Sequence, residues 1–150
     1  MKGFKVYTPL ILAQIFLFSC NIEPKEIEYG VDACSYCKMT IVDRQHAAEL
    51  VTNKGKTFKY DAIECMLRNM KEMENKNPKT FKYILVTDYL TPEKLIDATE
   101  ATYLISENIK SPMGANLSAF EEQNKTQEFM KNEKDTTFDW EGIQKYMYYE

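Results

Sequence analysis

Histidine is scarce in this chain of 150 residues, which contains only His46. Metal sites that need two or three imidazole ligands, such as three-histidine zinc sites, are therefore excluded within one chain. A Ser-His-Asp triad would have to be built on that single residue. Basic residues are also few, since 19 Lys and Arg stand against 23 Asp and Glu for a net charge of -4. Nucleic-acid binders need a basic face, so that class is disfavoured. Sulfur is the plentiful ligand, with four cysteines and eight methionines.

Long apolar runs are absent after the first twenty residues, and the one run that exists has the features of an export signal. Two lysines precede an apolar stretch over residues 6–18, which is too short for a spanning helix of about 20 residues. The stretch ends in Leu17-Phe18-Ser19-Cys20, which resembles a bacterial lipobox, although Phe18 is bulky for its place. Plain secretion, with Cys20 merely nearby, is the alternative. We expect a lipoprotein signal peptide over 1–19, an acylated Cys20 that opens a flexible tether over 20–32, and one domain over 33–150.

The periodicity of apolar residues after the tether predicts an α+β fold built from two similar ββα units, followed by a C-terminal helix. In the first unit, strands at 46–53 and 57–60 precede a helix that starts at a capping box of Asp61 and Glu64 and ends at Asn77-Pro78. In the second unit, strands at 102–105 and 117–120 precede a helix over 121–134. The remaining expected elements are a strand at 83–87, a Pro-led segment at 92–97, and a last helix carrying Trp140, Ile143, Tyr146 and Met147.

The segment Cys34-Ser35-Tyr36-Cys37-Lys38-Met39 places two thiols and a thioether within six residues. Thiolate and thioether ligands together select soft metals, above all Cu(I). Cys37 and Met39 share one side of an extended backbone, so they form the best local pair. Met113 is the leading third ligand, because it lies in a loop between Pro112 and Gly114.

Other sulfur and nitrogen ligands remain open. Cys34 could join the metal or could form a disulfide or redox pair with Cys37. Cys65 falls in the first turn of the predicted helix and could be an auxiliary ligand, a disulfide partner or a buried thiol. His46 is a further auxiliary candidate, although an ordinary structural role is commoner for a lone histidine. The methionines on the apolar stripe of the helix are expected to fill the core: Met66, Met70 and Met73.

Taken together, the lipobox, the segment from Cys34 to Ile41 and the segment from Ser111 to Phe120 resemble the NosL family of nitrous oxide reductase accessory lipoproteins. The resemblance implies two ββα units and a carrier rather than an enzyme. It implies a Cu(I) chaperone, anchored by lipid on the periplasmic side of the cell envelope, with the outer membrane favoured. The implied partners are nitrous oxide reductase, whose copper-sulfide centre is assembled, and an ABC-type maturation complex with its periplasmic companion. Cys37, Met39 and Met113 match the family motifs.

Three alternatives remain at this point. The first is a zinc-binding structural domain that uses Cys34, Cys37, Cys65 and His46. The second is a thiol-disulfide enzyme that works through Cys34 and Cys37. The third is a lipoprotein that only docks a partner, through tyrosines near its C-terminus.

Overall fold

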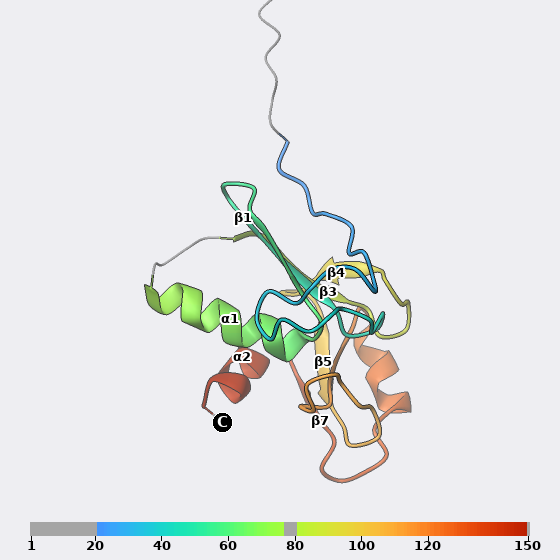
Figure 1. Cartoon of the computed structure of the whole chain (residues 1–150). Helices are drawn as coiled ribbons and strands as arrows, with labels where there is room; N and C mark the ends of the chain where they lie inside the picture. The colour runs from blue at the N-terminus through green and yellow to red at the C-terminus, as the bar shows by residue number, and fades with distance from the viewer. Residues whose placement is uncertain (1–20, 77–80, 150) are drawn as a thin grey trace, which may run out of the picture.

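The structure, a computed structural model, describes residues 21–76 and 81–149 and contains two antiparallel sheets side by side (Figure 1). The first sheet has the strand order β2-β1-β3-β4 and the second has the order β6-β5-β7. The predicted α+β class, with two small sheets and a C-terminal helix, is confirmed. The strands are β1 (Ala48–Thr52), β2 (Thr57–Tyr60), β3 (Phe81–Thr87), β4 (Leu95–Asp97), β5 (Thr102–Ile105), β6 (Leu117–Phe120) and β7 (Thr136–Phe138). The helices are α1 (Ile63–Lys76), the 3-10 helix η1 (Gln123–Glu128) and α2 (Trp140–Tyr149).

The hairpin of β1 and β2 follows from its turn residue and its apolar pattern. Gly55 adopts a φ of +77°, a conformation that side-chain-bearing residues rarely take. Strand β1 pairs with β2 on one side and β3 on the other, so Leu50 lies between Phe58 and Ile84. All five residues of β1 are buried, as expected of a central strand covered on both faces.

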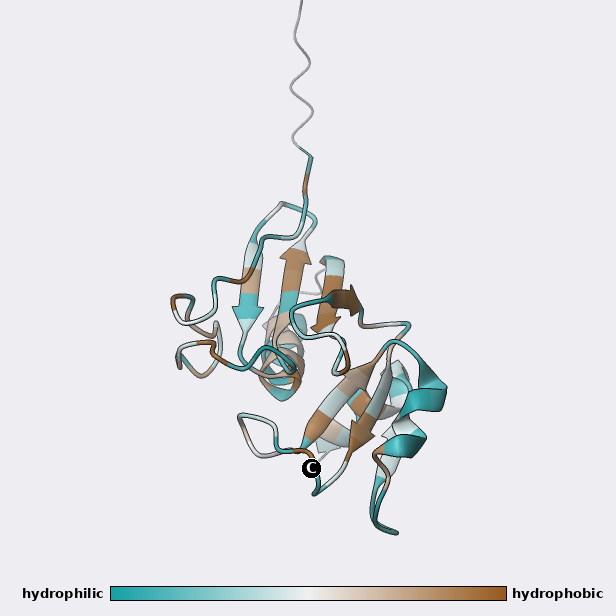
Figure 2. Cartoon of the chain, turned by 90° about the vertical axis from the view of Figure 1, so that its right-hand side faces the viewer, coloured by the Kyte–Doolittle hydropathy of each residue, from teal (hydrophilic) through white to brown (hydrophobic). Residues whose placement is uncertain are grey.

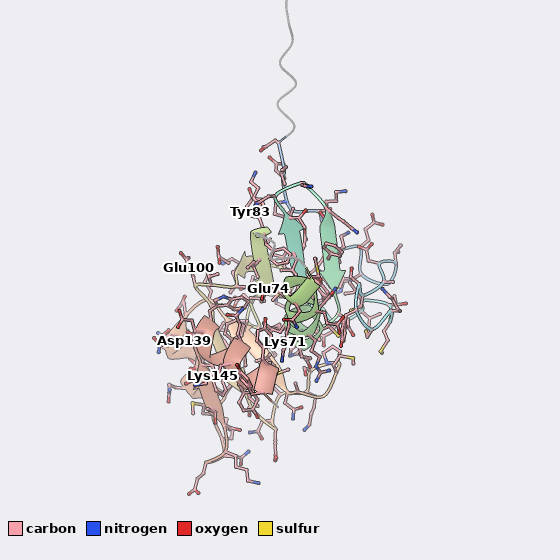
Figure 3. All side chains as sticks on the ribbon, turned by 90° about the vertical axis from the view of Figure 1, so that its left-hand side faces the viewer. Lys71, Glu74, Tyr83, Glu100, Asp139 and Lys145 are labelled. Carbon is pink, nitrogen blue, oxygen red and sulfur yellow. The ribbon has the colours of Figure 1, made fainter. Side chains whose placement is uncertain are left out.

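Helix α1 packs its apolar stripe on the first sheet and one basic residue on α2. Ile63, Met66, Leu67 and Met70 are buried at helical spacing, which confirms the core role predicted for Met66 and Met70. Further along, the Lys71 ammonium donates a hydrogen bond to the Tyr148 carbonyl of α2 and lies over that tyrosine's ring. Figure 3 labels Lys71 between the two helices. The predicted helix end at Asn77-Pro78 lies outside the described residues.

The second unit differs from the prediction in where its helix lies. The helix expected over 121–134 is the six-residue 3-10 helix η1. Residues 121–128 contain no apolar side chain, so an α-helix there would have no face to bury. The α-helix against β5 and β7 is instead α2, whose Ile143 is buried. The Pro-led segment also forms more structure than expected, since its last residues become β4.

The segment expected as a tether contacts the domain over most of its length. The Ile22 carbonyl accepts a hydrogen bond from the Lys82 ammonium, and the Lys25 amide donates to Glu49. Ile27 is buried in the core. The two hydrogen bonds therefore hold this polar stretch on the first sheet, and Ile27 joins it to the core. The predicted signal peptide and Cys20 lie outside the described residues.

One core joins the two sheets. Figure 2 shows the hydrophobic strands of both sheets beside each other. A single buried cluster contains residues of both, including Leu50 of β1 and Tyr103 of β5. A bridge between Asp88 and Ala119 links the sheets through the backbone. Across 21–76 and 81–149, no helix has the length and apolar character needed to traverse a bilayer.

Candidate metal centre

The cysteine segment forms a closed turn that is docked on the edge of β2. The Cys34 amide donates to the Met39 carbonyl at 2.8 Å, and Lys38 takes a φ of +70° to complete the turn. Ser35 pairs with Lys59 of β2, since its amide donates to the Lys59 carbonyl at 2.7 Å. Because β2 leads directly into α1, this pairing holds the turn against the start of that helix.

The start of α1 completes a cluster of four metal-binding side chains. Asp61 precedes the helix and Cys65 lies in its first turn, four residues later. The Sγ atoms of the three cysteines and a carboxylate oxygen all lie within 4.8 Å of one another. We call this set the thiol–carboxylate cluster, and it consists of Cys34, Cys37, Asp61 and Cys65.

The cluster is mostly closed to solvent but has one open corner. Cys34 and Cys65 are 1% and 0% exposed, and Cys37 is half-buried. All three cysteines carry free thiols. Cys37 is therefore the thiol through which a metal or a partner would reach the cluster.

The three thiols of the cluster differ in pKa. A hydrogen bond from the Cys65 thiol lowers the pKa of Cys34 to about 6, since it stabilises the Cys34 thiolate. The same contact raises the pKa of Cys65, whose proton is shared with that thiolate. Burial raises the pKa of Cys37. Near neutral pH the cluster therefore holds one thiolate, at Cys34, beside thiols that still carry protons.

The two predicted methionine ligands lie on segments next to the cluster. Met39 follows Cys37 in the same turn and is 54% exposed. Met113 is half-buried in the loop of residues 111–116. The Glu64 carboxylate anchors that loop to α1, because it accepts hydrogen bonds from Ser111 Oγ at 2.5 Å and from the Ala115 amide at 3.3 Å. Glu64 thus faces the second unit, a role that the predicted capping box did not anticipate.

His46 is not brought to the cluster. Its Nδ1 lies 3.0 Å from Asp43 Oδ1 and its Nε2 lies 3.0 Å from Ser118 Oγ. Both ring nitrogens are thus engaged in a buried network that joins the two sheets. In the described structure this histidine therefore lies between Asp43 and Ser118, and it is not a member of the thiol–carboxylate cluster.

Asp61 is the member of the cluster that sequence reasoning did not nominate as a ligand. Its carboxylate accepts a hydrogen bond from the Cys37 thiol at 3.5 Å. The spacing of four residues between Asp61 and Cys65 was the available signal, since a helix that began at Asp61 would carry both on one face. Asp61 was assigned from the sequence to the capping box at the start of the helix instead.

The fold and the cluster define a class: an α+β domain with a buried, sulfur-rich site suited to a thiophilic metal. The family model for NosL matches residues 24–148, and the chain belongs to the NosL family. The fold is also that of a crystal structure described as the copper chaperone NosL from Shewanella denitrificans. The two share 16% identity with a TM-score of 0.63, over 81% of this chain and 95% of the other. No curated protein matches the chain.

Proposed function

We propose that the chain is a Cu(I) chaperone, anchored by lipid at Cys20 on the periplasmic side of the cell envelope. The observation that carries this proposal is the convergence of three thiols at one half-open point of the fold. Three sulfur donors suit a soft monovalent ion, and a solvent-facing thiol suits a cargo that must leave again. Membership of the NosL family and the copper chaperone named among the similar structures support the same function.

The proposed transfer ligands are Cys37, Met39 and Met113, with Cys34 and Cys65 as auxiliary thiols. Met39 and Cys37 belong to one turn, and the Glu64 contacts hold the Met113 loop against the helix that carries Cys65. When only the three transfer ligands bind the metal, a fourth coordination position stays open. A partner's ligand can therefore enter before a donor ligand leaves, and copper passes through a shared intermediate. Thioethers carry no proton, so only the cysteines make binding pH-dependent.

The proposed client is nitrous oxide reductase, whose copper-sulfide centre would receive the copper, with an ABC-type maturation complex and its periplasmic companion as partners. This step rests on the family membership. Its test is transfer of Cu(I) from the loaded chaperone to the metal-free reductase. The rate should exceed that of free chelated copper at equal concentration.

The copper site is tested by anaerobic titration of the reduced protein with Cu(I) against a chromophoric chelator. We expect one tight equivalent that is weakened in both Cys37→Ser and Met113→Ala. Met130→Ala is the matched control, since Met130 is half-buried in the small cluster around Phe120 rather than beside the thiols. Wild-type affinity in both site variants would remove the proposed ligand set.

The anchor is tested separately by growth with a labelled fatty acid. The wild-type protein should carry the label and sediment with membranes, and Cys20→Ala should do neither. Label retained in Cys20→Ala would show that Cys20 is not the acylated residue.

A further inference from the structure

The end of the first sheet that meets the N-terminal segment carries three exposed lysines. Lys54 and Lys56 lie in the turn between β1 and β2, and Lys82 lies beside that turn because its neighbour Phe81 pairs with Thr52. Figure 1 shows this hairpin and the N-terminal segment at one end of the molecule, with β5 and β7 toward the other. We call Lys54, Lys56 and Lys82 the basic end.

The charges of the basic end are not neutralised by neighbouring acids. Residues 52–60 and 81–87 contain no Asp or Glu. Among the described residues, none of the three lysines forms an ion pair, whereas Lys59, further along β2, is paired with Asp32. The three ammonium groups are therefore available to a partner of opposite charge.

Charge is also distributed unevenly between the two halves of the domain. Residues 21–87 contain 11 basic and 10 acidic residues, whereas residues 88–150 contain 6 lysines and 13 acidic residues. All three strands of the second sheet belong to the second stretch. A negatively charged surface would therefore attract the basic end and repel the half of the molecule that contains the second sheet.

Aromatic rings accompany two of these lysines. The Lys56 ammonium lies 4.6 Å from the centroid of the Phe58 ring, and the Lys82 ammonium lies 5.3 Å from that of Tyr83. Figure 3 labels Tyr83 near the N-terminal segment. Both rings are half-buried. Lysines beside aromatic rings are typical of surfaces that lie at the boundary between lipid headgroups and water.

The N-terminal segment joins this end of the domain to the proposed anchor. The Ile22 carbonyl accepts a hydrogen bond from the Lys82 ammonium at 2.9 Å, and Ile22 is only two residues from Cys20. Residues 21–25 add one acid and one lysine, so they leave the charge balance unchanged. An acylated Cys20 would therefore bring the basic end close to the headgroups.

We propose that the basic end rests on the anionic headgroups of the bilayer that holds the anchor. The second sheet then points away from the lipid. This inference rests on the lipid anchor of the proposed function and does not depend on copper binding. The acyl chains hold the protein on the bilayer, and the lysines fix its orientation there.

The size of the effect follows from the number of lysines. Each lysine near an anionic membrane favours contact about fivefold, so three favour the docked orientation about 100-fold. The attraction acts over a Debye length, which is about 8 Å at physiological ionic strength and about 3 Å in 1 M salt. High salt should therefore release the basic end while the acyl chains keep the protein on the membrane.

The test uses the mature acylated protein, free of metal, on two kinds of vesicle. One contains phosphatidylcholine alone, and the other also contains phosphatidylglycerol. An amine-reactive reagent followed by mass spectrometry gives the rate at which each lysine is modified. On anionic vesicles the lysines of the basic end should react at least about fivefold more slowly than on neutral ones. Lys131 and Lys134 are the internal controls, since both are exposed and precede β7, and their rates should not change.

Substitutions test whether charge causes the protection. Lys54→Gln should reduce the protection of Lys56 and Lys82 about fivefold. Lys134→Gln is the matched control, because it removes the same charge from the other half of the domain, and it should leave the protection unchanged. Salt at about 1 M should abolish the protection, although the protein still sediments with the vesicles.

The outcomes separate the docking from the anchor. A protein that sediments with both kinds of vesicle but whose lysines react at equal rates on both would overturn the docking and uphold the anchor. Equal protection on neutral vesicles, or protection that survives about 1 M salt, would overturn the electrostatic cause. A protein that sediments with neither kind of vesicle would refute the anchor, and the docking with it.

Discussion

Removing the hydroxyl of Ser111 should loosen the loop that carries Met113. Ser111 Oγ donates to the Glu64 carboxylate at 2.5 Å and accepts from the Asn116 amide at 2.9 Å. In Ser111→Ala, Glu64 keeps only the longer bond from Ala115, and its Oε2 is already buried without a partner among the described atoms. A bond to a charged group contributes about 1.5–3 kcal/mol and a neutral one about 0.5–1.5 kcal/mol. We therefore expect a loss of about 2–4.5 kcal/mol in the free energy of unfolding.

The assay is urea unfolding followed by circular dichroism, with Cu(I) affinity measured on the folded protein. Ser118→Ala is the matched control, because Ser118 is also buried and its hydroxyl contacts His46 Nε2 at 3.0 Å. It should lose about 1 kcal/mol and keep its metal affinity. Glu64→Gln should change stability by less than about 1 kcal/mol, because the amide oxygen still accepts both bonds and the buried charge is removed.

Copper binding supplies the second readout for the same loop. Ser111→Ala should weaken Cu(I) binding less than Met113→Ala does, and the double variant should bind no worse than Met113→Ala alone. The reasoning is refuted if Ser111→Ala unfolds no more easily than Ser118→Ala. It is equally refuted if the effects of Ser111→Ala and Met113→Ala on copper affinity simply add.

Three further predictions concern single side chains. The ultraviolet absorbance of the metal-free protein should show one thiolate that forms as the pH rises through about 6, and Cys34→Ser should lack that step. The deprotonated form is the one favoured in the folded state, so the signal must be lost below that pH rather than above it. Met66→Leu and Met70→Leu should each alter the free energy of unfolding by less than about 1.5 kcal/mol and leave Cu(I) affinity unchanged, whereas weaker binding would make either a ligand. His46→Ala should cost at least about 1–3 kcal/mol by stranding its buried partners, and unchanged metal titrations would agree with a structural role.

The parts of the fold that sequence predicted are those in which local pattern and tertiary burial agree. The strands at 102–105 and 117–120 match β5 and β6 residue for residue, because β-branched and apolar residues there alternate with turn signals. Residues 121–134 lack such agreement. Their polar first eight residues offer an α-helix no face to bury, and tertiary contacts make α2 the α-helix that packs on β5 and β7.

The site was predictable in its sulfur content but not in its geometry. Cys34 and Cys37 are neighbours in sequence, whereas Cys65 reaches them only because Ser35 pairs with Lys59 at the edge of β2. No local pattern encodes that pairing. The roles of Asp61 and Glu64 were hidden for the same reason, since an acidic first turn is ordinary at a helix start. Their function depends on what the rest of the chain places opposite them.

The hairpin of β1 and β2 has a consequence for how the protein would stand on a membrane. Its tip touches the N-terminal segment, since a Cβ at Gly55 would lie 3.5 Å from Ile22 Cγ1. An anchor at Cys20 would be only two residues from that contact, a reach of about 7 Å. From Gly55 to Asp61 the chain runs six residues, which span about 20 Å as a strand. With Cys20 acylated, the hairpin would therefore hold the thiol–carboxylate cluster at a fixed distance from the lipid surface, where a partner could reach it.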